Sequence, residues 1–475
     1  MKIISKTLRF IPIFFLVIGL SSCSNDDDAN PPGNNQPETI VEIASANPIF
    51  STLVAALQAA DGDLVTVLNG AGPFTVLAPT NDAFDAFLTA NNFNSLEEVP
   101  TDVLAQILLN HVIAADVSST DLVNLGSGYT STQATGAGGQ NMSLYFDTTT
   151  GVRFNNVASV TTGGADVDAS NGTIHIIDAV IGLPSVVNHA LANPAFSNLV
   201  SALGLADGGL VDVLSGDGPF TVLAPDNDAF NAFLDGAALT DVPTDALAQV
   251  LLNHVLAGTT LSTDLVNAGA GYTSTSASGP NSSNLSLYFN TSDGVSFNGV
   301  STVAQADVIG TNGVIHAVDA VIGIPTVVTF ALADPNFSTL VTALTELTPG
   351  TDFAGILSRT EGMNMDGINP EFTVFAPTND AFAALSSIPE EAVLTQVLLH
   401  HVISEANVRS GDLTDGISPA MLNGQTITIN LPGTGDNIAD VTDGAGNSDV
   451  GIVAVDVQAG NGVIHVLNKV MLPGE

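Results

Sequence analysis

Three short strings recur three times along this chain in the same order, and this repetition constrains its fold more than any other feature. The first string reads FTVLAPTNDAF at residues 74–84, FTVLAPDNDAF at 220–230 and FTVFAPTNDAF at 372–382. A Leu-Leu-Asn/His-His-Val string follows it, beginning at Leu108, Leu251 and Leu398. An Asn-Gly-Thr/Val-Ile-His string closes each unit, beginning at Asn171, Asn312 and Asn461.

The spacing of these strings predicts whole domains. Successive copies lie roughly 140 to 150 residues apart, which is an ordinary domain size and too long for solenoid repeats. We therefore expect three tandem domains, here called repeats 1, 2 and 3, at residues 38–184, 185–325 and 326–475.

Each repeat opens with a helix signal. An Asn or Asp precedes a Pro at positions 47, 193 and 334, so an N-cap residue stands before a residue suited to the first helical turn. In repeat 1, Phe50, Leu53, Val54 and Leu57 then follow the spacing of an amphipathic helix, and repeats 2 and 3 keep this pattern. The FTV segments predict short buried strands that end in a turn into a helix. The closing Asn-Gly pairs predict hairpin turns before core strands.

Together the FTV string, the His-Val string and the closing Asn-Gly string resemble the fasciclin domain family. The resemblance covers nearly everything after residue 37 and recurs three times. It implies an α+β fold for each domain, a β-sandwich or wedge flanked by helices. It also implies roles in cell adhesion and matrix contact.

Repeat 3 departs from the other two in length. The opening Pro and the Pro of the FTV string are 31 residues apart in repeats 1 and 2 and 42 apart in repeat 3. The extra eleven residues fall within 347–371. A tolerated surface insertion is the simpler interpretation, and a long loop with a function of its own is the alternative.

The N-terminus has the features of a lipoprotein signal. Residues 1–22 combine a basic start with a short apolar stretch, and Cys23, the only cysteine of the chain, follows small residues as in a bacterial lipobox. Residues 23–37 are acidic and rich in Pro and Asn, which predicts a disordered tether. We expect a lipid-anchored outer-membrane protein exposed at the cell surface. An ordinary secretory signal, or a periplasmic orientation, is the alternative.

The charge of the chain narrows its partners. Seven basic residues stand against 48 acidic ones, for a formal net charge of −41. Such a field repels phosphate backbones, so we expect no nucleic-acid partner. We expect surface or matrix proteins or glycans as partners, and contact with the membrane only through the lipid anchor.

Six of the eight histidines recur at repeat positions and are the first candidates for chemistry. They fall in the His-Val strings and in the closing strings: His111, His254, His401, His175, His316 and His465. A histidine on an apolar face is usually a hydrogen-bonded core residue, and recurrence in three domains fits a folding role better than one catalytic centre. We expect structural core histidines and no cofactor, with metal binding as the alternative.

Receptor-binding motifs of the resembled family are not matched. Fasciclin domains that bind cell receptors often carry a Tyr-His pair at the His-Val string, but here Asn110, Asn253 or His400 precedes the histidine. Arg-Gly-Asp does not occur, and the nearest string is Arg-Ser-Gly-Asp at 409–412. The sequence therefore does not support the receptor contacts known in animals.

Calcium is a weaker candidate. The acid-rich stretch 436–449 of repeat 3 offers four carboxylates as possible ligands: Asp436, Asp440, Asp443 and Asp449. A solvated loop is the usual fate of such a run, so we expect no metal site.

Known enzyme signatures do not occur in the sequence, which contains no G-x-S-x-G elbow, no H-E-x-x-H motif and no phosphate loop. We therefore expect a protein that is not an enzyme and has no catalytic residues. The interpretation is an adhesion, matrix or biofilm protein that makes weak multivalent contacts. A periplasmic or outer-membrane accessory protein with a structural or ligand-capturing role is the first alternative, and a hydrolase with Asp/His pairs is the second.

Overall fold

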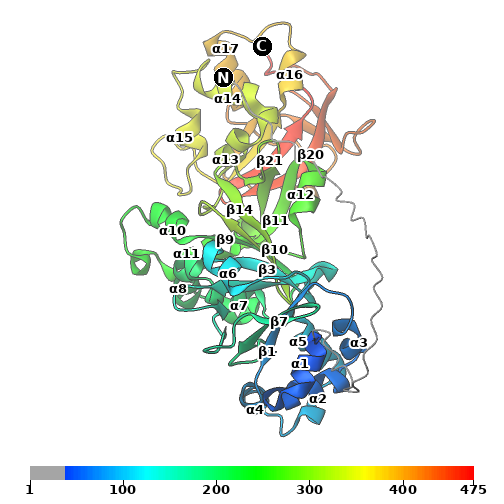
Figure 1. Ribbon diagram of the computed structural model, residues 1–475. Helices are drawn as coiled ribbons and strands as arrows, with labels where there is room; N and C mark the ends of the chain where they lie inside the picture. Colours follow the sequence, from blue (N-terminus) through cyan, green and yellow to red (C-terminus); the bar gives the residue numbers. More distant parts are fainter. Residues whose placement is uncertain (1–37) are drawn as a thin grey trace, which may run out of the picture. The chain divides into compact units, whose positions relative to one another are not determined.

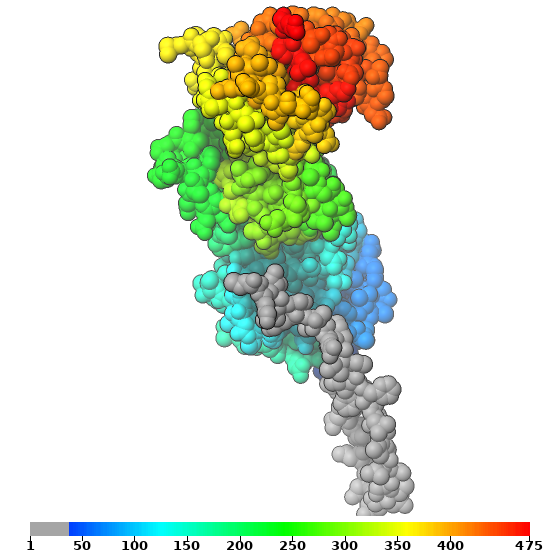
Figure 2. All heavy atoms as spheres, turned by 90° about the horizontal axis from the view of Figure 1, so that it is seen from above, coloured from blue at the N-terminus to red at the C-terminus, as the bar shows by residue number. Residues whose placement is uncertain are grey.

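The computed structural model describes residues 38–475. The signal peptide, Cys23 and the tether predicted from the sequence lie outside the described residues. In Figure 2 the yellow-to-red atoms of repeat 3, the green atoms of repeat 2 and the blue-to-cyan atoms of repeat 1 gather in three successive regions.

All three repeats alternate short helices with strands in a similar order (Figure 1). Repeat 1 contains α1 (Ile40–Ala46), η1 (Pro48–Phe50), α2 (Ser51–Ala59), α3 (Leu64–Leu68), β1 (Phe74–Pro79), α4 (Asn81–Ala90), η2 (Leu96–Glu98), α5 (Thr101–Leu109), β2 (Val112–Ile113), α6 (Ser119–Leu125), β3 (Ser127–Thr135), η3 (Ala137–Gly139), β4 (Asn141–Asp147), β5 (Arg153–Phe154), β6 (Ala158–Ser159), β7 (Val167–Ala169) and β8 (Gly172–Ile177). Repeat 2 contains α7 (Val186–Ala192), η4 (Pro194–Phe196), α8 (Ser197–Leu205), α9 (Leu210–Leu214), β9 (Phe220–Pro225), α10 (Asn227–Leu234), η5 (Leu239–Asp241), α11 (Thr244–Leu252), β10 (Val255–Ala257), α12 (Ser262–Ala268), β11 (Ala270–Ser278), η6 (Pro280–Ser282), β12 (Asn284–Asn290), β13 (Ser296–Phe297), β14 (Ser301–Ile309) and β15 (Gly313–Val318). Repeat 3 contains α13 (Val327–Ala333), η7 (Pro335–Phe337), α14 (Ser338–Thr345), α15 (Phe353–Leu357), β16 (Phe372–Pro377), α16 (Asn379–Ala383), α17 (Glu391–Leu399), β17 (Val402–Ser404), η8 (Ser410–Asp412), β18 (Thr428–Asn430), β19 (Ala439–Thr442), β20 (Val450–Ala459) and β21 (Gly462–Leu467).

The FTV strings form short, mostly buried strands, as predicted, and each is called the central strand here because it lies between two neighbouring strands. β1 pairs in parallel with the closing strand β8 and antiparallel with β2, and β9 and β16 have equivalent partners. Side chains alternate across this strand, so Val76 and Ala78 pack under the helices while Leu77 packs against the other strands. Each repeat therefore has two hydrophobic cores, one on either face of its central strand.

The predicted α+β class is confirmed, and the sheets close differently in the three repeats. The strands of repeat 2 form a closed barrel, in which β10 bridges β9 and β11. The equivalent strands of repeat 1 form two four-stranded sheets, and repeat 3 has one six-stranded sheet.

Hydrogen bonds explain why the closing Asn-Gly pair recurs. The Asn171 side chain donates to Leu68 O and Gly70 O and accepts from the backbone N–H of Ile40, so it links three segments of repeat 1. Asn312 and Asn461 make the same three bonds in their repeats. A Cβ atom at Gly172 would lie 1.8 Å from Phe74 O, so only glycine fits beside the central strand.

Two details of the helices differ from the sequence predictions. The helix predicted after the Asn-Pro pair begins with a 3₁₀ turn that runs into α2, and a further helix, α1, precedes this pair. The middle helix α5 ends at Leu109, so His111 lies just beyond its C-terminal end and not on its apolar face. The N-cap itself is confirmed, since the Asn47 side chain accepts from Ile49 N at 3.2 Å.

Within residues 38–475, no single helix is long and apolar enough to cross a membrane. Two bent helix pairs reach that length and composition, at Ile40–Ala46 with Pro48–Ala59 and at Val327–Ala333 with Pro335–Thr345. Both pairs pack apolar side chains into the core of their repeat.

Candidate functional site

The histidines of the His-Val strings are buried and use both ring nitrogens. His111 Nε2 accepts from Ile181 N at 3.0 Å, which leaves Nδ1 to donate to Ile107 O at 2.7 Å. His254 and His401 make equivalent pairs of bonds, with Val250 O and Ile322 N and with Val397 O and Met471 N. Burial lowers the pKa of all three histidines to about 4, so the rings are neutral near pH 7. Each ring thus joins the end of a middle helix to the segment that follows the closing strand.

The histidines of the closing strands face the backbone in a similar way. His175 Nε2 lies 2.9 Å from Val117 O, and Nδ1 accepts from Asp166 N at 3.2 Å. His316 makes equivalent bonds to Thr260 O and Asp307 N. His465 bonds to Val408 O, but its Nδ1 has no hydrogen-bond partner among residues 38–475. Burial lowers the pKa of His316 and His465.

A serine and an aspartate lie beside each closing-strand histidine. In repeat 1, Ser119 donates to Asp166 through both its backbone N–H and its hydroxyl, and Ser262 with Asp307 and Ser410 with Asp456 do the same. The aspartate has a positive φ of 54° in repeat 1, which its hydrogen bonds to the serine stabilise. Because the hydroxyl is directed at the carboxylate and Nε2 of His175 at a backbone carbonyl, the serine and the histidine of this cluster do not form a nucleophile–base pair with each other.

The position before the middle histidine is buried in every repeat. Asn110 donates to Gly182 O and accepts from the Thr132 hydroxyl, and Asn253 has equivalent bonds. His400 lies between Asn423 and the backbone N–H of Gly444. All three side chains are 0% exposed, so this position is not available to a partner protein. Arg409 of the Arg-Ser-Gly-Asp string donates to the Ser283 hydroxyl of repeat 2 and pairs with Asp456.

The four calcium candidates do not converge. Asp440 accepts from Thr434 N and Asn437, whereas Asp443 accepts from Asn447 and from Leu472 N. Asp449 pairs with Lys469. Among residues 38–475, no hydrogen bond connects Asp436 to the other three aspartates or their partners. Within residues 38–475, no group of three or more His, Cys, Asp or Glu is arranged to hold a metal ion.

Two tyrosine-bearing hairpins contact the repeat that follows them, and these contacts were not predicted from the sequence. Tyr129 of β3 packs on Tyr145 of β4 and on His189 of repeat 2, with ring centroids 5.1 and 5.6 Å apart. Tyr272 packs on Tyr288 and on Phe330 of repeat 3 with nearly the same geometry, at 5.0 and 5.6 Å. Tyr129 joins the core of repeat 2, and Tyr272 and Tyr288 join the core of repeat 3.

Backbone contacts around these tyrosines are also equivalent. The Ser143 hydroxyl accepts from Ile309 N of repeat 2 at 2.9 Å, and the Ser286 hydroxyl accepts from Gln458 N of repeat 3 at 2.9 Å. The two contacts between repeats are therefore copies of one interface. Its signal was present in the sequence, because Gly-Tyr-Thr-Ser-Thr and Ser-Leu-Tyr-Phe occur in repeats 1 and 2 and not in repeat 3.

Comparisons with known proteins agree with this architecture. The profile of the Fasciclin domain matches residues 48–184, 194–325 and 335–473. Transforming growth factor-beta-induced protein ig-h3 of Sus scrofa is 29% identical over 451 residues, which are 92% of this chain and 58% of that protein. The chain thus spans little more than half the length of this relative.

One bacterial relative and one solved structure add to the comparison. Cell surface glycolipoprotein MPB83 of Mycobacterium bovis is 32% identical over 153 residues, 31% of this chain and 62% of that protein. A FAS1 domain pair from the insect cell adhesion molecule Fasciclin I is 20% identical, with a TM-score of 0.36 over 58% of this chain and 97% of that one.

Proposed function

Because this chain belongs to the fasciclin domain family over all three of its repeats, we propose that it is a lipid-anchored extracellular protein for adhesion or matrix interaction. It binds surface or matrix proteins or glycans through weak contacts that add up over the repeats. The family match in three consecutive copies is the observation that carries this proposal. The interface between repeats 1 and 2 and that between repeats 2 and 3 are equivalent, so successive repeats are joined by the same contacts.

Multivalency accounts for the triplication better than a single tight site does. Binding hot spots are usually rich in Trp, Tyr and Arg, but the chain has no Trp and its four tyrosines all lie in the hairpins between repeats. Linked weak sites raise the effective local concentration of the second contact, so the avidity can exceed the affinity of one site by about 10²-fold or more.

In this proposal the six recurrent histidines stabilise the fold of each repeat. Each of the six links segments of its own repeat through a buried hydrogen bond to a backbone carbonyl. The protein then needs no cofactor, and these rings have no catalytic role.

Anchoring is assigned to Cys23, in line with the surface glycolipoprotein among the relatives. Acyl chains contribute ~0.8 kcal/mol for each buried methylene, and stable attachment takes at least two chains. Cys23→Ser should therefore release the protein from the outer-membrane fraction. Unchanged fractionation of this variant would contradict lipid anchoring while leaving adhesion untested, so the two claims are measured separately.

Adhesion is tested by attachment under flow. Cells that display repeats 1 to 3, repeats 1 and 2, or repeat 1 alone are compared on matrix-coated surfaces, with the folding of each form checked by circular dichroism. We expect attachment to rise steeply with the number of repeats. Attachment that depends on repeat 3 alone, or that is equal for all forms, would contradict multivalent adhesion.

A further inference from the structure

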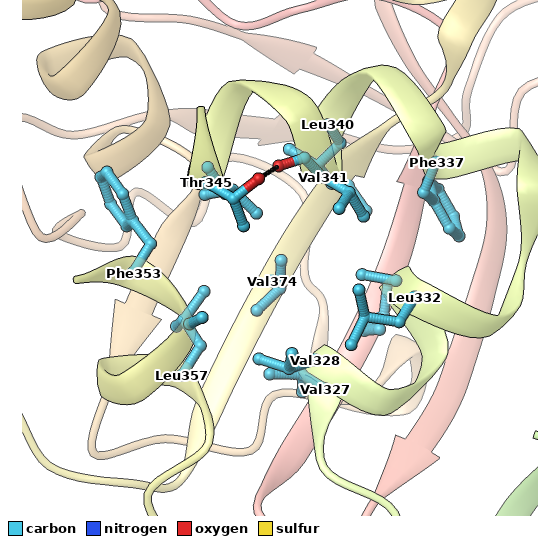
Figure 3. Close-up of a pocket in the computed structure, with 15 residues that line it drawn as sticks. Val327, Val328, Leu332, Phe337, Leu340, Val341, Thr345, Phe353, Leu357 and Val374 are labelled. Carbon is cyan, nitrogen blue, oxygen red and sulfur yellow. Dashed lines mark hydrogen bonds between the residues drawn. The ribbon is translucent and has the colours of Figure 1, made fainter. Parts of the chain in front are cut away.

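Repeat 3 contains an apolar cavity with a volume of about 180 Å³ (Figure 3). Helices α13, α14 and α15 surround it, and β16 and β21 contribute Val374, Ala376 and Ile464. Of the fifteen lining residues, Thr345 alone has a polar side chain, and its hydroxyl donates to Val341 O at 2.8 Å. The cavity thus offers no free polar group to a ligand.

The same place in repeat 1 is almost filled. There, the equivalent helices α1 and α2 and strands β1 and β8 enclose a cavity of about 20 Å³. Three lining positions carry smaller side chains in repeat 3, where Ala354, Val327 and Thr345 replace Val65, Ile40 and Gln58. Two others are larger, because Phe353 replaces Leu64 and Leu332 replaces Ser45. The connection from α14 to α15 is also longer than that from α2 to α3, because it runs from Thr345 to Phe353 rather than from Ala59 to Leu64. The insertion of repeat 3 and its smaller side chains therefore coincide with the enlarged cavity.

The cavity of repeat 3 also opens to the surface. Ala44 and Leu57 of repeat 1 are 5% and 6% exposed, whereas their counterparts Ala331 and Leu344 are partly exposed. Leu332 at the same opening is 65% exposed. A ligand can thus reach the cavity between the helices without unfolding of the repeat.

We propose that this cavity is a binding site for a small, neutral, apolar molecule about the size of benzene. An apolar cavity of ~150 Å³ in another protein stays dry and binds benzene, and this one is similar in volume and lining. A carboxylate or ammonium group would lose its hydration without gaining a partner, so charged ligands are excluded. Glu346 and Asp352, both exposed and next to lining residues in sequence, further disfavour anions.

Benzene and benzoate test the proposed ligand class on the full-length protein. Methyl groups of Val, Leu and Ile are labelled with ¹³C, and each compound is titrated while NMR shifts are recorded. We expect benzene to bind with a Kd on the order of 1 mM and to shift the methyl signals of Val327, Val341, Leu344 and Leu357. Benzoate, with the same ring and a carboxylate, should leave them unchanged. The proposal would be overturned if both compounds shifted these signals equally, or if benzene shifted only signals of residues outside repeat 3.

A cavity-filling variant provides the matched test of location. Val327→Ile combined with Ala354→Val introduces the residues that repeat 1 carries at these positions and reduces the free volume of the cavity. We expect benzene to bind at least ten times more weakly to this variant. Val266→Ile, at a 58% exposed position of α12, adds one methylene outside the cavity and should leave binding unchanged. If the filled variant folds and binds benzene as tightly as the unmodified protein, the site lies elsewhere. If the variant does not fold, the positions of the shifted methyl signals in the unmodified protein show whether benzene binds in this cavity.

Discussion

Repeats 1 and 2 differ from repeat 3 in the segment that contacts a following repeat. In the first two, a seven-residue helix leads into a tyrosine hairpin, β3–β4 or β11–β12, whose first strand has nine residues. In repeat 3, a three-residue 3₁₀ turn stands in place of that helix, and the strands β18 and β19 have only three and four residues. The tyrosine hairpin is therefore present in the two repeats that another repeat packs against, and absent from repeat 3.

The helix that receives the hairpin carries a different residue in each copy at the position that lies under the tyrosine. Counted from the helix N-cap, this position is Ile43 in repeat 1, His189 in repeat 2 and Phe330 in repeat 3. His189 and Phe330 are 0% exposed under the tyrosines of the preceding repeat, whereas Ile43 is only partly buried. One framework thus carries an ionisable ring at the first interface and a neutral ring at the second.

Lowering the pH should have the largest effect on the relative stabilities of the repeats. Burial lowers the pKa of His189 and His254 in repeat 2 to about 4, while repeats 1 and 3 each have one such histidine, His111 and His401. The unfolded chain takes up these protons near pH 6.5 and the folded chain does not, so the free energy of unfolding falls as the pH drops from 6.5 towards 4. Each histidine contributes ~1.4 kcal/mol per pH unit.

Between pH 6.5 and 5, we therefore expect His189 and His254 to cost repeat 2 about 3 kcal/mol and His111 to cost repeat 1 about half as much. Burial also lowers the pKa of His316 in repeat 2 and of His400 and His465 in repeat 3, so these two repeats should both lose more than repeat 1. Most carboxylates remain ionised in this range, so relief of repulsion among them offsets little of the loss. Hydrogen exchange with mass spectrometry, resolved by repeat, measures the difference. Equal loss of protection in all three repeats would contradict this assignment.

Loss of a middle histidine should have the next largest effect. His254→Ala removes two buried hydrogen bonds and leaves Val250 O and Ile322 N without the ring, at a cost of up to about 3 kcal/mol. The equivalent His401→Ala should cost a similar amount, because its bonds have the same geometry. Chemical denaturation measures both variants, and unchanged unfolding midpoints would exclude a structural role for these rings.

The sequence was sufficient for the three repeats and their buried FTV strands, because both depend on local patterns that recur three times. It did not reveal the interface between repeats or the cavity. Tyr129 and Tyr272 contact side chains of the next repeat; the strings around them show that repeats 1 and 2 share a segment that repeat 3 lacks, but not what this segment contacts. The cavity depends on the small residues Ala354 and Val327 together with the position of α15, which only packing in three dimensions fixes.

The hydroxyl groups of the interface tyrosines provide a smaller, matched comparison. Tyr272 donates to Asp334 at 3.1 Å in the second interface, whereas the Tyr129 hydroxyl of the first finds no hydrogen-bond partner among residues 38–475. Tyr272→Phe should therefore cost about 2 kcal/mol, because the 5% exposed carboxylate of Asp334 loses a donor. Tyr129→Phe should cost little or nothing. Thermal unfolding of the two variants measures the difference, and equal costs would show that the interfaces are energetically alike.

The smallest expected effect comes from exchanging the ring that distinguishes the two interfaces. His189→Phe gives repeat 2 the residue that repeat 3 has at Phe330, and it removes a buried Nδ1 that has no partner among residues 38–475. It also removes the bond from Nε2 to Ile309 O, so the two changes should nearly cancel at pH 7. At pH 5.5 the variant should be more stable than the unmodified protein by about 1 kcal/mol, because one group that disfavours folding in acid is gone.

The reverse exchange is the control for this assignment. Phe330→His introduces a titratable ring into the second interface, which should destabilise the protein more at pH 5.5 than at pH 7. If both variants instead keep the pH dependence of the unmodified protein, then His189 is not the source of the difference. The acid sensitivity of repeat 2 would then have to come from outside its contact with Tyr129.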